Sequence, residues 1–181
     1  MPNWAIALIV LLAGLALAEA CWILMSRRRS QHLRGRFGPE YDRVIQEHGD
    51  ARRAERVLET REKRVEKLHI RSLDQTERDL FVQAWQKDQS RFVDDPQGAV
   101  LEADHLVSEV MAARGYPMSN FEQRAADISV DHPHLVENYR AAAEIALRQK
   151  RGNATTEDLR QAMVYYRKLF DELLETSEVR R

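Results

Sequence analysis

The sequence predicts an all-α protein in which one N-terminal transmembrane helix is followed by a charged, membrane-proximal helix and a distal helical bundle. Three observations predict this fold class. Residues 4–25 are almost uniformly apolar, strand-like alternation never extends beyond a few residues, and apolar residues recur at helical spacing through most of the remaining chain. Only seven Gly and five Pro occur among 181 residues, which is unlike the frequent turn residues of an all-β domain.

We divide the sequence into five segments on this basis. They are a transmembrane anchor at 1–26, a basic juxtamembrane linker at 27–39, a charged helix at 40–70, a helical bundle domain at 74–175 and a frayed tail at 176–181.

The predicted anchor, residues 4–25, contains one ionisable side chain, Glu19, apart from the lone Cys21. At about 1.5 Å per residue this helix spans about 33 Å, which matches a hydrocarbon core of about 30 Å. Trp4 and Trp22 lie near its two ends, where indole rings favour the membrane interface. Ala16-Leu17-Ala18 also resembles a signal-peptide cleavage site, but no Lys or Arg precedes the apolar stretch, as a signal peptide would require.

A run of arginines directly after the anchor predicts the orientation of the protein. These residues are Arg27, Arg28, Arg29, Arg34 and Arg36. Since cytoplasmic flanks are enriched in Lys and Arg, we expect a single-pass protein of the inner (cytoplasmic) membrane, with its N-terminus outside and its C-terminal domain in the cytoplasm. We expect the arginines to contact anionic lipid.

The distribution of charge argues against nucleic acid as a partner. Residues 26–73 hold 14 Lys and Arg against 8 Asp and Glu, whereas residues 74–181 hold 14 against 20. A basic segment beside the membrane followed by an acidic domain fits lipid attachment better than a nucleic-acid-binding domain, which would be basic.

The charged helix at 40–70 carries one narrow apolar stripe. Val44, Ala51, Leu58 and Val65 recur every seven residues between charged neighbours, which is typical of a short coiled coil and would allow a homodimer. Two alternatives remain open: the helix lies against the domain, or it is a solvated spacer. Gly49, next to Asp50, predicts a kink that weakens the coiled-coil interpretation.

The distal domain divides into amphipathic segments that begin at recognisable caps. The predicted helices begin at the Asp74–Glu77 capping box, at Asp95-Pro96, at Ser119-Asn120, at Asp131-His132-Pro133 and at Thr155-Thr156. Each apolar stripe must be buried against another element, so we predict a helical bundle.

One cluster of side chains could carry chemistry. Asp127, Asp131, His132 and His134 are types that bind metals or transfer protons, although their position around a proline at a predicted helix start favours a capping role. The sequence contains no HExxH, CxxC, G-x-S-x-G or phosphate-binding glycine motif, so it predicts no cofactor.

Two stretches resemble a group of uncharacterised bacterial proteins with the same layout of anchor and helical region. These stretches are Arg36 to Arg43 (RFGPEYDR) and Phe121 to Pro133 (FEQRAADISVDHP). The resemblance implies a bacterial setting, and it brings no activity and no functional residues, since that group has none assigned.

These observations favour a membrane-tethered protein-interaction or scaffold protein with an unidentified protein partner over an enzyme. The alternative is a metal-dependent or small-ligand enzyme that uses the region from Asp127 to His134.

Overall fold

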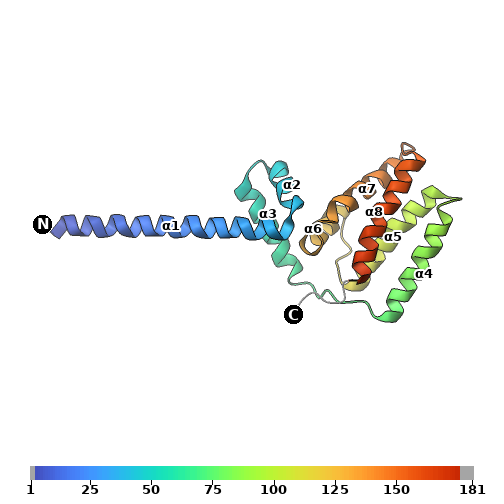
Figure 1. Ribbon diagram of the computed structural model, residues 1–181, viewed down its shortest axis with the longest axis horizontal. Coiled ribbons are helices and arrows are strands. Elements are labelled where there is room, and N and C mark those ends of the chain that lie inside the picture. Colours follow the sequence, from blue (N-terminus) through green and yellow to red (C-terminus); the bar gives the residue numbers. More distant parts are fainter. Residues whose placement is uncertain (1–2, 176–181) are drawn as a thin grey trace. The chain divides into compact units, whose positions relative to one another are not determined.

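The computed structural model describes residues 3–175, with side chains described from residue 11 onward, so the predicted tail at 176–181 lies outside the described residues. Over these residues the chain is helical without strands, which confirms the predicted all-α class (Figure 1). The helices are α1 (Asn3–Phe37), α2 (Pro39–His48), α3 (Ala51–Val65), α4 (Gln75–Arg91), α5 (Pro96–Arg114), α6 (Phe121–Asp131), α7 (Val136–Lys150) and α8 (Thr156–Glu175). The chain divides into two compact units, Met1–Leu58 and Glu59–Arg181.

Helix α1 continues without interruption from the predicted anchor into the predicted linker at 27–39 and ends at Phe37. This segment lacks proline before Pro39 and is rich in Arg, which favours helix. The predicted anchor at 4–25 begins in a stretch, residues 4–10, whose side chains lie outside the described ones. Across the described part of the chain, no helix is both long enough and apolar enough to cross a membrane.

The predicted helix at 40–70 is divided into α2 and α3 by Gly49. This residue has a φ of 68°, a left-handed conformation that glycine adopts at little cost, and its N–H donates to the carbonyl of Ile45 at 2.8 Å. Asp50 then caps α3, because its carboxylate accepts from the backbone N–H of Arg52 and of Arg53 at 3.3 and 3.1 Å.

Most of the apolar heptad stripe of this segment is buried by other parts of the same chain. Val44, Leu58 and Val65 are each fully buried, whereas Ala51 is exposed. Three of the four heptad positions are therefore already covered in this fold, which favours packing within the chain over a coiled coil with a second copy.

Within the first unit, α2 and α3 lie beside the C-terminal part of α1, and the N-terminal part of α1 extends away from them (Figure 1). Large apolar side chains of that extended part are 45–72% exposed. They are Leu11, Leu12, Leu15, Leu17, Trp22, Ile23, Leu24 and Met25.

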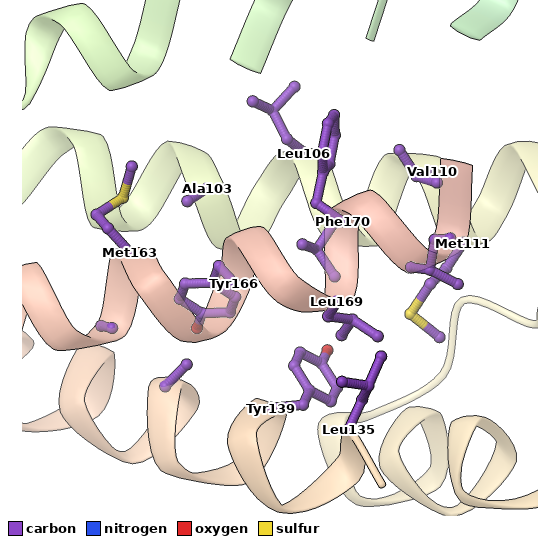
Figure 2. Packing of buried hydrophobic residues seen from close by; sticks show 14 of the residues in the cluster. Ala103, Leu106, Val110, Met111, Leu135, Tyr139, Met163, Tyr166, Leu169 and Phe170 are labelled. Atoms are coloured by element: carbon purple, nitrogen blue, oxygen red, sulfur yellow. The ribbon is translucent and has the colours of Figure 1, made fainter. Parts of the chain in front are cut away.

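The second unit contains the predicted helical bundle, which the structure confirms. Helix α8 packs along both α5 and α7, α4 packs against α5, and α6 packs against α7. Figure 2 shows α8 between α5 and α7, with Tyr166 and Leu169 of α8 facing Tyr139 of α7 and Leu135, the residue before α7. Trp85 of α4 stacks on Phe170 of α8, with ring centroids 4.6 Å apart.

The predicted helix start at Asp131-His132-Pro133 is wrong. Helix α6 continues to Asp131, His132 is its C-terminal cap, and α7 begins only at Val136. The cause is Pro133, because the residue before a proline is excluded from the helical region. His132 accordingly has φ −129° and ψ 57°, and its N–H donates to the carbonyl of Ile128 at 2.8 Å.

Candidate functional site

The four residues of the predicted polar site contact different partners. Asp127 is completely buried, and Nη2 of Arg64 donates to both of its carboxylate oxygens, at 2.6 and 2.5 Å. Gln123 adds a bond from Nε2 at 3.2 Å. Burial raises the pKa of the Asp127 carboxyl and the Arg64 guanidinium opposes that effect. Asp127 therefore joins the last turn of α3 to α6.

Asp131 and His132 lie at the other end of α6 and contact other helices. The Tyr116 hydroxyl donates to Asp131 at 3.2 Å, and Nδ1 of His132 lies 3.2 Å from a carboxylate oxygen of Glu172 on α8. Burial lowers the pKa of the His132 imidazole, and Glu172 opposes this. His134, two residues further on, is exposed in the connection to α7.

A buried arginine that the sequence did not indicate completes this junction. Arg114, at the end of α5, is 5% exposed and donates from Nη1 to the carbonyl of Leu173 at 2.7 Å. Its Nε donates to the carbonyl of Arg71 at 3.3 Å. Arg114 thus satisfies a carbonyl at the end of α8 and one in the linker between α3 and α4, where backbone groups lack helical partners. The whole junction is explained by packing and hydrogen bonding.

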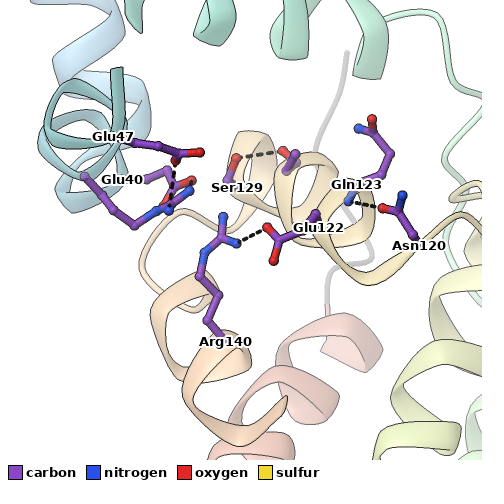
Figure 3. A network of polar contacts seen from close by, with 9 residues as sticks. Glu40, Glu47, Asn120, Glu122, Gln123, Ser129 and Arg140 are labelled. Atoms are coloured by element: carbon purple, nitrogen blue, oxygen red, sulfur yellow. Dashed lines mark hydrogen bonds and ion pairs between the residues drawn. The ribbon is translucent and has the colours of Figure 1, made fainter. Parts of the chain in front are cut away.

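The N-terminal end of α6 is likewise occupied by structural contacts. Asn120 caps the helix by accepting from the backbone N–H of Gln123 at 2.9 Å, and Arg140 of α7 donates to Glu122 at 3.2 Å (Figure 3). Within the described part of the chain, no group of three or more His, Cys, Asp or Glu residues could hold a metal ion.

Asp88 is a buried carboxyl without a hydrogen-bond partner, and sequence reasoning missed it. It lies on α4, is 3% exposed, and neither carboxylate oxygen is bonded to a described residue. Burial raises its pKa to about 6, with a further contribution from Glu102. The sequence did contain a sign of this burial, because helical spacing places Asp88, three residues after Trp85, on the same apolar face as Phe81 and Phe92.

The arginines predicted to contact lipid differ in how they are engaged. Arg34 lies over the ring of Tyr41, 5.0 Å from its centroid, and 3.6 Å from the Asp42 carboxylate, so it faces α2. Arg29 lies 3.9 Å from Glu55, and Arg36 is half-buried. Arg27 and Arg28 are exposed and form no ion pair with any described residue.

Glu55 joins the three helices of the first unit. It is 6% exposed and accepts from the Ser30 hydroxyl of α1 at 2.5 Å and from the Tyr41 hydroxyl of α2 at 3.0 Å. Burial raises the pKa of the Tyr41 hydroxyl, and the bond to Glu55 adds to that effect. A single carboxylate of α3 therefore holds α1 and α2 immediately after the apolar part of α1.

Comparison with known proteins finds no matching family model, no matching curated protein and no matching solved structure. The resemblance to uncharacterised bacterial membrane-anchored proteins therefore stays a prediction.

Proposed function

We propose that the chain is a membrane-tethered interaction or scaffold protein. In this proposal residues 4–25 span the cytoplasmic membrane, the N-terminus lies outside, and the bundle is held at the cytoplasmic face, where it binds a protein partner. The observation that carries the proposal is the row of large apolar side chains on α1, from Leu11 to Met25, which are 45–72% exposed in this fold.

The energetics of insertion support the anchor. Residues 4–25 include ten Ile, Leu and Val residues, each of which contributes about 0.3–0.6 kcal/mol to insertion, or about 3–6 kcal/mol together. An acidic side chain at the membrane centre costs about 3 kcal/mol, and Glu19 lies towards one end, where the cost is smaller. A helix that is apolar on all faces needs burial in a core or in lipid, and the described side chains of this stretch, residues 11–25, are all exposed in this fold.

The interaction role rests on what the bundle offers to a partner. The polar clusters around Asp127, Arg114 and His132 are engaged in contacts between helices. Single large apolar residues remain exposed on different helices of the bundle, among them Leu80, Leu101 and Leu147. Aliphatic side chains offer a partner apolar contact area and carry no reactive group.

Extraction of membranes tests the tether. The full chain is expected to stay with membranes that have been washed at alkaline pH, whereas a Leu12→Arg, Leu15→Arg variant is released. Leu80→Arg is the matched control, because that residue is equally exposed but lies on the bundle. Wild-type protein in the wash supernatant would contradict the tether.

Affinity purification of the full chain from solubilised membranes tests the interaction role. We expect a stoichiometric protein partner that is lost when Leu80, Leu101 or Leu147 is replaced by Asp, with the bundle still folded by circular dichroism. Absence of any partner above background under several growth conditions would count against a scaffold.

A further inference from the structure

We propose that the first turn of α3 and the start of the arginine run on α1 together form a binding surface for the phosphate groups of anionic phospholipids. The site consists of Arg27 and Arg28 of α1 and Arg52 and Arg53 of α3. It rests on the proposed membrane tether, and it deepens that proposal by adding a second segment of the chain, far away in sequence, to the lipid-contacting surface.

The fold returns the chain to the end of the apolar segment. Helix α3 begins near α1, and the guanidinium carbon of Arg52 in its first turn lies 5.2 Å from the centroid of the Trp22 ring. One turn later on α3, Glu55 contacts Arg29 and Ser30 of α1. Tryptophan near the end of a membrane helix favours the headgroup region, so Arg52 lies at headgroup depth when α1 is inserted.

The first turn of α3 supplies positive charge on the side of α1 where the arginine of α1 itself is paired with an acid. At 100° per residue, Arg29 lies on the same face of α1 as Trp22, whereas Arg27 and Arg28 lie on the other faces. Arg29 is directed to the buried Glu55. Arg52, beside the Trp22 ring, therefore supplies a cation on that face, and Arg53 follows it in the first turn of α3.

These four arginines have charge available for a ligand. All four are exposed, and none forms an ion pair with a described residue. The one acid in the turn, Asp50, accepts backbone N–H groups of α3 with both carboxylate oxygens. Guanidinium groups bind phosphate oxygens in a bidentate manner, and each cation near an anionic bilayer strengthens binding about fivefold.

Native mass spectrometry of the full chain in detergent tests the site, with phosphatidylglycerol as the anionic lipid and phosphatidylcholine as the zwitterionic one. The wild type is expected to retain phosphatidylglycerol preferentially. Arg52→Gln, Arg53→Gln is expected to weaken that binding about 25-fold, and the corresponding lysine variant is expected to restore most of it. Lys150→Gln, Arg151→Gln is the matched control, since it removes the same charge from an exposed part of the bundle.

Two results would overturn the proposal. One is phosphatidylglycerol binding by the Arg52→Gln, Arg53→Gln variant as tight as that of the Lys150→Gln, Arg151→Gln control. The other is binding of inorganic phosphate by the wild type, without lipid, that is as tight as its binding of phosphatidylglycerol, which would assign the site to a free anion. Alkaline extraction of the same variants separates the membrane tether from the headgroup site. A wild-type chain that stays in washed membranes but does not prefer phosphatidylglycerol refutes the headgroup site and leaves the tether standing.

Discussion

The pair between Arg64 and Asp127 predicts an asymmetric response to mutation. The Asp127 side chain is 1% exposed and the Arg64 side chain is 35% exposed. Arg64→Ala leaves a buried carboxylate with only the Gln123 amide, and loss of one partner of a buried pair costs about 3–5 kcal/mol. Asp127→Ala leaves a guanidinium that water can reach, so the cost falls to about 1–2 kcal/mol.

Native-state hydrogen exchange of the full chain, measured on peptides that cover α6, is the appropriate assay because it reports on one helix. Arg64→Ala is expected to accelerate exchange at least 100-fold, which corresponds to about 3 kcal/mol, and Asp127→Ala about tenfold. Lys63→Ala is the control, because it removes the same charge from an exposed neighbouring position. The reasoning is refuted if Arg64→Ala resembles this control, or if Asp127→Ala has the larger effect.

Three further predictions concern single residues. The pKa of the Asp88 carboxyl rises from 3.8 to about 6 on folding, so this group favours the folded state below pH 3.8 and that contribution is lost as the pH rises through 6. Asp88→Asn should therefore raise the free energy of opening of α4, measured by hydrogen exchange, by up to about 3 kcal/mol at pH 7.5 and hardly at pH 4. Asp79→Asn is the control and should change it at neither pH. Gly115 has a φ of 97° and a Cβ there would lie 2.6 Å from a linker carbonyl oxygen, whereas Gly152 has a φ of 74° with open space around it. Gly152→Ala has only the cost of the left-handed conformation, about 1–2 kcal/mol, so Gly115→Ala should lower the thermal midpoint of unfolding further. Equal effects of the two variants would contradict the close contact between position 115 and the linker carbonyl. Glu55→Ala should speed the proteolysis of α2 and α3 while α5 and α8 stay protected, and unchanged cleavage would show that this carboxylate does not hold the first unit together.

Much of the bundle could be predicted from the sequence, because its helices begin with local hydrogen-bonding patterns. The Asp74–Glu77 capping box forms as predicted, with reciprocal bonds of 2.8 and 3.0 Å. Asp95 caps α5 and Gly115 ends it in a left-handed conformation. Such caps involve residues three or four positions apart, so the sequence alone contains the whole interaction.

The contacts that the sequence could not reveal are long-range or depend on the backbone path. Arg64 and Asp127 are 63 residues apart, and neither position shows a sign of the other. The two histidines around Pro133 resembled a helix start, whereas the proline in fact ends α6. The return of Arg52 to Trp22 follows from the turn at Gly49, whose breaking effect was visible although its direction was not.

The position of the C-terminus relative to the membrane tests the central claim most directly. Fusions of the full chain to a reporter that is active only in the cytoplasm, and to one that is active only outside it, measure that position. We expect activity from the cytoplasmic reporter alone, in the membrane fraction, with residues 4–25 retained in the mature protein. Activity only from the external reporter, or a mature N-terminus that begins after Ala18, would contradict the tether.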